Sequence, residues 1–118
     1  MSVSPSFRTF VVDQLSRVVP QVRSRSMFGG VGVYSGSLFF ALISNDTLYF
    51  KADDSSRPDF ERRGMAPFRP FGTRARAMQY YQVPEECLEE LEMLRSWAET
   101  AVLAARRKTA HSSQRRRA

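Results

Sequence analysis

The stretch from Arg25 to Lys51 constrains the fold most, because its pattern predicts three strands joined by tight turns. β-branched and aromatic residues form three apolar runs, separated by Ser35-Gly36 and Asn45-Asp46. Turns this short join neighbouring strands that run in opposite directions. The sequence therefore predicts a three-stranded antiparallel meander, with strands at Arg25 to Tyr34, Ser37 to Ile43 and Thr47 to Lys51.

Helical patterns and two further apolar runs flank this meander. Ser4 supplies a capping hydroxyl before a proline at the first helical position, and Pro20 stops the helix that follows. Gly64 is a C-terminal stop for a second, shorter helix. The expected elements are a helix to about Val19, a short helix over Arg57 to Arg63, strands at Pro67 to Phe71 and Ala77 to Val83, and a long helix from Pro84, with a break near Glu90 left open.

The resulting order is α-β-β-β-α-β-β-α. It predicts an α+β fold of two layers, in which helices pack mainly on one face of a single five-stranded antiparallel sheet. The length of 118 residues is the common size of one domain. We expect this domain over residues 1–108 and a disordered basic tail over residues 109–118, because the tail has no apolar anchor.

Charge is distributed unevenly along the chain. The segment from residue 106 to residue 118 carries six of the 18 Lys and Arg residues and none of the 12 Asp and Glu residues, so residues 1–105 carry twelve of each sign. A nucleic-acid interpretation of the basic composition therefore concerns the tail alone. The candidate contacts for weak, sequence-independent nucleic-acid binding are Arg106, Arg107, Lys108, Arg115, Arg116 and Arg117.

Residues that carry chemistry are scarce. Cys87 and His111 are the only Cys and His residues, too few for a zinc site, and an internal disulfide has no second cysteine. His111 falls in the expected disordered tail, so we expect no catalytic Ser-His-acid or Cys-His set and no cofactor. A cytoplasmic location fits the single cysteine. The start of the chain does not resemble a secretory signal, and no apolar run approaches the ~20 residues of a membrane helix.

Carboxylates gather after the meander. Asp53, Asp54, Asp59 and Glu61 could form a catalytic pair or bind a divalent ion. Capping and first-turn roles at the short helix explain them better. An enzyme with a carboxylate site remains the least favoured alternative.

Three glycines, Gly29, Gly30 and Gly32, fall in the segment from Met27 to Tyr34. Backbone amides of such a segment can enclose a phosphate, but the lysine and hydroxyl of a P-loop do not follow, and strand formers stand where a helix would begin. The favoured interpretation is a bulge or a strongly twisted strand close to another backbone. The same segment is the expected protein-interaction surface, with the residues Phe28, Gly29, Gly30, Gly32 and Tyr34.

Several short segments occur in a distinctive order. They are Met27 to Tyr34, Phe40 to Ile43, Asp46 to Lys51, Arg57 to Phe60, Pro67-Phe68, Tyr80 to Glu86 and Trp97-Ala98. Together they resemble the N-terminal domain of the TfoX/Sxy family, over about Arg25 to Arg107. The resemblance implies a single antiparallel sheet similar to type III secretion chaperones, a link to the regulation of natural competence and DNA uptake, and no catalytic residues. Longer members carry a second, C-terminal helical domain.

The leading interpretation is a non-enzymatic regulatory module that binds a protein partner, with the transcription machinery as a candidate. A homodimer is also expected, because the strands carry more apolar side chains than one inward face can hold. They are Val33, Leu38, Phe39, Phe40, Leu42, Leu48, Tyr49 and Phe50. Pairing two copies would bury about 800 Å² on each. The alternative is that a helix covers this face and leaves a monomer.

Overall fold

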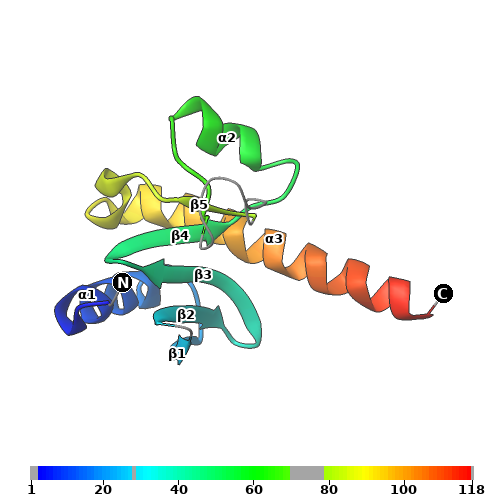
Figure 1. Cartoon of the computed structure of the whole chain (residues 1–118), viewed down its shortest axis with the longest axis horizontal. Coiled ribbons are helices and arrows are strands. Elements are labelled where there is room, and N and C mark those ends of the chain that lie inside the picture. Colours follow the sequence, from blue (N-terminus) through cyan, green and yellow to red (C-terminus); the bar gives the residue numbers. More distant parts are fainter. Residues whose placement is uncertain (1–2, 28, 70–78, 118) are drawn as a thin grey trace.

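The computed structural model describes residues 3–27, 29–69 and 79–117, and it describes side chains as far as Arg107. One antiparallel sheet, in the strand order β1-β2-β3-β4-β5, forms a layer against which the helices pack (Figure 1). The elements in chain order are α1 (Pro5–Ser16), β1 (Val22–Met27), β2 (Gly30–Ser35), β3 (Leu38–Ser44), β4 (Thr47–Lys51), α2 (Arg57–Arg62), β5 (Tyr80–Gln82), the 3₁₀ helix η1 (Glu85–Leu88) and α3 (Leu91–Arg117). The predicted α+β class with a single five-stranded antiparallel sheet is confirmed.

Helix α1 begins as predicted and ends earlier. The Ser4 hydroxyl accepts a hydrogen bond from the Phe7 amide at 3.3 Å, and proline occupies the first turn. The helix ends at Ser16, with Arg17 as its C-cap. The amides of Val18 and Val19 both bond to the Leu15 carbonyl, and both side chains are buried in the core.

The predicted strand from Arg25 to Tyr34 is in fact a hairpin. Strands β1 and β2 pair in register from Val22 with Ser35 to Met27 with Gly30, leaving a two-residue connection at positions 28 and 29. Gly29 has a φ of 78°, a left-handed conformation that glycine adopts without strain. Phe28 lies outside the described residues. The single-strand prediction was wrong because this glycine turns the chain.

Strands β3 and β4 lie within a residue of their predicted ranges. Asn45 and Asp46, which join them, both have a φ of 54°, as a tight hairpin turn with two left-handed residues requires. The register between β2 and β3 shifts between Val33 and Tyr34, so the bulge expected in the glycine segment occurs at its end.

Among the described residues, the sequence after α2 contributes less strand than predicted. Pro67 forms only an isolated bridge, with Tyr81, because proline has no amide proton for a ladder. The other part of this predicted strand, from Pro70 onward, lies outside the described residues. β5 falls within the predicted range from Ala77 to Val83. The five strands are therefore divided as four before α2 and one after it.

The last helical region is broken near Glu90, as the sequence analysis allowed. η1 ends at Leu88 and α3 begins at Leu91. The backbone of α3 is helical to Arg117, over the segment for which the sequence predicts a disordered tail. The domain boundary at residue 108 stays a prediction. Within the described residues, no helix combines the length and apolar character needed to cross a membrane.

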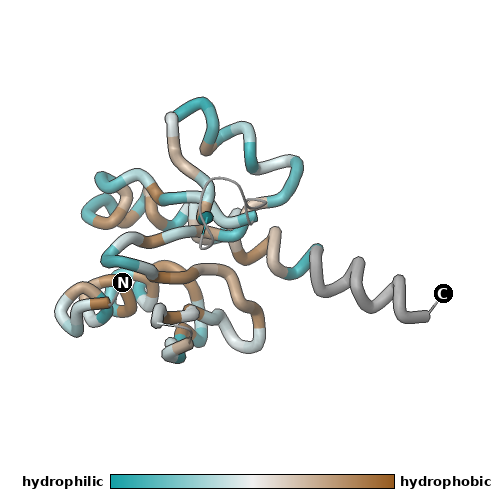
Figure 2. Tube along the Cα trace, in the orientation of Figure 1, coloured by the Kyte–Doolittle hydropathy of each residue, from teal (hydrophilic) through white to brown (hydrophobic). Residues whose placement is uncertain are grey.

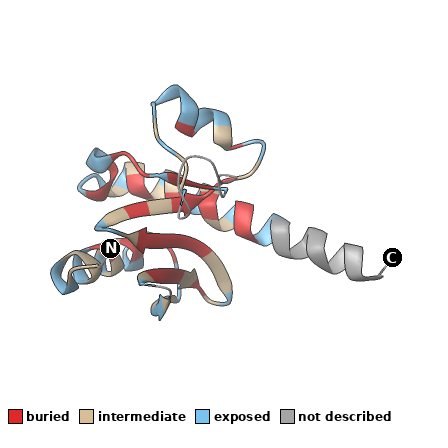
Figure 3. Ribbon diagram, in the orientation of Figure 1, coloured by how far each residue is buried: buried red, intermediate tan, exposed pale blue. Residues whose placement is uncertain are grey.

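The core lies between α3 and the middle of the sheet. Figure 2 shows hydrophobic residues along β3, and Figure 3 shows the buried residues gathered on the central strands and on the part of α3 that lies against them. Leu94, Ala98 and Ala101 form the buried side of α3. Alanines at this contact let the helix approach β3 and β4 closely.

The outer face of the sheet exposes less apolar surface than the sequence suggests. Of the residues expected to compete for the inner face, four belong to the buried core cluster: Val33, Phe40, Leu48 and Phe50. On the outer face Leu42 is only 9% exposed, and the large apolar side chains exposed in the described part of the chain are Phe10 and Leu103. The homodimer stays a prediction.

Replacing Gly30 by alanine should loosen the junction of β2 and β3. A Cβ at Gly30 would lie 2.7 Å from the Ile43 carbonyl oxygen, so a backbone must move. We expect Gly30→Ala to lower the free energy of unfolding by about 1–3 kcal/mol. At Gly32 the closest obstacle is the flexible end of Met27, so Gly32→Ala should change it by less than about 1 kcal/mol. Urea denaturation checks this order, and equal losses for both variants would contradict it.

Candidate functional site

The glycine-rich segment contributes to two different surfaces. Gly29 and Gly30 line a cleft beside the start of α1. Gly32 is buried under the end of Met27 and the ring of Phe39. Tyr34 stacks on Phe39, with ring centroids 5.1 Å apart. The structure therefore brings only two of the five predicted interaction residues together at one opening, and Phe28 lies outside the described residues.

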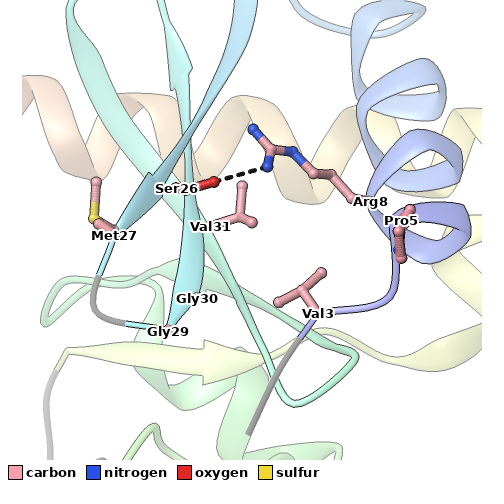
Figure 4. A pocket seen from close by; sticks show the side chains of 8 residues that line it. All are labelled: Val3, Pro5, Arg8, Ser26, Met27, Gly29, Gly30 and Val31. Atoms are coloured by element: carbon pink, nitrogen blue, oxygen red, sulfur yellow. Dashed lines mark hydrogen bonds between the residues drawn. The ribbon is translucent and has the colours of Figure 1, made fainter.

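The cleft lies between the first turn of α1 and the tip of the β1–β2 hairpin (Figure 4). Its volume is about 470 Å³. Apolar and polar groups share its wall, which consists of Val3, Pro5, Arg8, Ser26, Met27, Gly29, Gly30 and Val31. This mixed lining can accept a small apolar group and a polar or charged group next to it.

Arg8 connects α1 to β1 at the edge of this cleft. Its Nη1 donates to the Ser26 hydroxyl at 2.9 Å, and its Nη2 and Nε donate to the Ser24 hydroxyl at 3.0 and 3.3 Å. Within the described residues no carboxylate lies within 4 Å of this half-buried guanidinium. A charge held by neutral hydroxyls keeps its attraction for an anion.

The arginines around β1 have no acidic partner among the residues that the structure describes. The sequence has no Asp or Glu between Asp13 and Asp46. Arg17, Arg23 and Arg25 fall in this interval, and in the described part of the chain none of them forms an ion pair. By contrast, an acidic partner lies within 4 Å of Arg57, Arg62, Arg63, Arg95 and Arg107. The hairpin side of the domain therefore carries uncompensated positive charge.

The two edges of the sheet differ in their backbone hydrogen bonds. At the β5 edge, the Phe68 amide donates to the Tyr80 carbonyl at 2.7 Å and the Gln82 amide donates to the Ala66 carbonyl at 2.9 Å. Along β1, alternate residues turn their N–H and C=O groups away from β2, as in any antiparallel ladder. Among the described residues none bonds to that outer side. β1 is thus an open edge.

Sequence reasoning did not find this surface. It counted charge over residues 1–105, where the total is zero, and that total conceals the local excess at the hairpin. A usable signal was present in the long interval without acidic residues. Which strand would lie at an open edge follows only from the topology of the sheet.

The carboxylates after β4 have structural roles. The Asp53 carboxylate accepts hydrogen bonds from the Ser55 amide and hydroxyl and from the Ser56 amide, and Arg107 donates to it at 2.9 Å. Partial burial alone would raise the pKa of Asp53, but these hydrogen bonds outweigh that effect and hold the pKa at about 2. Asp54 pairs with Arg57, and Asp59 pairs with Arg62. Asp59 occupies the first turn of α2 as predicted, whereas Asp53 holds the turn before the helix and the N-cap residue Ser56 makes no side-chain capping bond.

The remaining candidates are dispersed. Cys87 is buried, and burial raises the pKa of its thiol to about 11, so it is protonated at neutral pH. Arg107 is engaged with Asp53 and Ser55, whereas Arg106 is exposed. The side chains of Lys108, Arg115, Arg116 and Arg117 lie outside the described residues. In the described part of the chain no three His, Cys, Asp or Glu side chains gather as metal ligands would.

Comparison with models of known protein families identifies the family of this chain. The family model described as the TfoX N-terminal domain matches residues 13–105. The chain belongs to the TfoX N-terminal domain family. This TfoX N-terminal domain includes the whole β1–β2 hairpin, whereas Val3, Pro5 and Arg8 on the cleft wall precede the matched residues. A search of curated proteins found no match.

Removing the charge of Asp53 should weaken the junction of α2 with α3. We expect Asp53→Asn to lower the free energy of unfolding at pH 7 by about 1 kcal/mol, allowing for solvent screening. Asp54→Asn is the matched control, because the Asp54 side chain is 96% exposed, and its effect should stay within about 0.5 kcal/mol.

The effect of Asp53→Asn should depend on pH. The folded pKa of Asp53 lies below the ordinary value of 3.8, so its stabilisation is fully present above that value and is lost as the pH falls toward about 2. Urea denaturation from pH 7 down to pH 2 should show the two stability curves converging in this window. A difference that persists unchanged at pH 2 would contradict the role of the charge.

Proposed function

We propose that this chain is a non-enzymatic regulatory module that binds a protein partner through the β1–β2 hairpin. The observation that carries the proposal is the open edge of β1, flanked by Arg23 and Arg25, which have no acidic partner in the described structure. Membership of the TfoX N-terminal domain family supports a regulatory role related to competence. The transcription machinery is a candidate partner, and a cytoplasmic location fits that role.

The state of the Asp53 carboxylate supports a non-catalytic function. Asp53 is ionised and its oxygens are occupied by hydrogen bonds from Ser55, Ser56 and Arg107. A general acid or base that works near neutral pH needs a pKa close to that pH. A pKa of about 2 leaves Asp53 unable to deliver a proton there.

Nucleic-acid binding through the tail has weaker support. Arg107, one of its six candidate contacts, already donates to Asp53 and Ser55. Each phosphate contact adds only a modest, salt-dependent share of affinity, so losing one of six matters. The hairpin offers both charge and an unpaired backbone, and the second feature favours a protein.

A quantitative pull-down tests the function. The bait is the full chain, either as wild type or as the hairpin variant Arg23→Glu/Arg25→Glu. The control variant Arg62→Glu/Arg106→Glu changes the net charge by the same amount, but at positions on α2 and α3. We expect wild type and control to recover the same protein at similar yield, and the hairpin variant to recover about tenfold less. Undiminished recovery by the hairpin variant would contradict the proposal, provided that its circular dichroism matches wild type.

A further inference from the structure

We propose that the partner segment is an acidic stretch in extended conformation, which adds to the sheet as a new strand beside β1. This inference rests on the proposed function and specifies the chemistry of the partner. Two independent properties of β1 point to it: the side of its backbone that faces away from β2, which bonds to none of the described residues, and the positions of the arginines along it.

The backbone of β1 sets the shape of the partner. An edge strand presents N–H donors and C=O acceptors alternately along one line. Another extended peptide matches this alternation, since it offers the complementary groups at the same spacing. β1 extends over six residues, from Val22 to Met27, which is an ordinary strand length. The open edge therefore has room for a full strand.

The side chains of β1 set the charge of the partner. Arg23 and Arg25 pair with Tyr34 and Gly32, so both lie on the face of the sheet opposite α1, two residues apart. Both are exposed, and the Arg23 guanidinium lies over the Tyr34 ring at 5.7 Å from its centroid. An added strand with Asp or Glu at alternate positions would place its carboxylates beside these two guanidiniums.

The face of β1 toward α1 determines which residues the partner can have between its carboxylates. Ser24 and Ser26 point toward α1, where both bond to Arg8. At the hairpin tip this face opens into the cleft that the side chains of Val3, Pro5 and Val31 line (Figure 4). The partner residues between the carboxylates should therefore be small or hydroxylic, with an apolar side chain where the strand passes the cleft.

Two other occupants fit less well. A second copy that paired through its own β1 would bring Arg23 and Arg25 of both chains together on one face, and like charges across strands repel. A nucleic acid would satisfy the guanidiniums, but its phosphates would meet the outward carbonyls of the edge. Only an acidic peptide matches both the charges and the alternating backbone groups.

Peptide binding tests the inference. The probe is a labelled peptide of about ten residues in which Glu alternates with Thr, and a second peptide has Lys in place of Glu. By fluorescence anisotropy at low salt, we expect the Glu peptide to bind wild type and the Arg62→Glu/Arg106→Glu control equally, and Arg23→Glu/Arg25→Glu about tenfold more weakly. The Lys peptide should show the reverse preference, and a circular dichroism spectrum that matches wild type shows that the variant is folded. Equal binding of the Glu peptide to all three proteins would overturn the inference.

Backbone methylation separates strand addition from simple charge attraction. Two further Glu peptides carry N-methyl groups at alternate positions, one on the Glu residues and one on the Thr residues. An added strand directs only every second amide at β1, so one methylated peptide should lose binding and the other should keep it. Equal binding by both methylated peptides would overturn strand addition.

Other outcomes distinguish a failure of the acidic-peptide inference from a failure of the proposed function. If the hairpin variant loses its protein from lysate but the Glu peptide does not bind wild type, the acidic chemistry is wrong and the proposed function stands. Tighter binding of a single-stranded oligonucleotide that also depends on Arg23 and Arg25 overturns the peptide in favour of nucleic acid. A dimer in sedimentation equilibrium that dissociates in the hairpin variant overturns it in favour of a second copy.

Discussion

The packing of α3 across β3 and β4 is the contact on which the rest of the fold depends. Ala98 and Ala101 are almost completely buried at this contact, so the helix approaches the centre of the sheet without large side chains between them. Burial falls away from this centre (Figure 3). β1 lies at one border, and its main contacts within the described residues are with β2 and α1. Because the core is completed without β1, the outer side of that strand remains available for other contacts.

Charge is segregated around this core. Acidic residues of the turn before α2 are matched to arginines, and the pair of Asp53 with Arg107 joins that turn to α3. Beside β1 the Arg8 guanidinium donates instead to the neutral hydroxyls of Ser24 and Ser26. The total charge of residues 1–105 is zero by count, yet the interval from residue 14 to residue 45, which includes β1 and β2, carries three arginines and no Asp or Glu. Such an excess steers an acidic partner toward the edge where backbone groups are free to pair.

Local signals were sufficient for much of the fold. The Ser4-Pro5 start of α1, the Asn45-Asp46 turn and the strand from Thr47 to Lys51 were predicted from residue types alone and are present. The hairpin was missed because a pair of glycines allows either a turn or a close approach, and here Gly29 makes the turn while Gly30 lies against the Ile43 carbonyl. Each glycine has one of the two roles, and no local sequence pattern indicates which glycine makes the turn and which lies against another backbone.

The candidate site was less predictable for a different reason. The sequence located the glycine segment, but the features that distinguish the site in the described structure are an edge strand without a neighbour and arginines without acidic partners. Both depend on how distant segments are arranged. The β5 edge is hydrogen bonded to Ala66 and Phe68, and nothing in the residues of β1 and β5 indicates which of the two would remain open.

Amide hydrogen exchange, followed by NMR, tests the central claim most directly. In the free protein, alternate amides of Val22–Met27 should exchange rapidly, since they face away from β2. With the acidic peptide bound, these same amides should become protected, and those of Tyr80–Gln82 should stay unchanged. Protection that arises at β5, or on the helices, while β1 continues to exchange as in the free protein, would contradict the account.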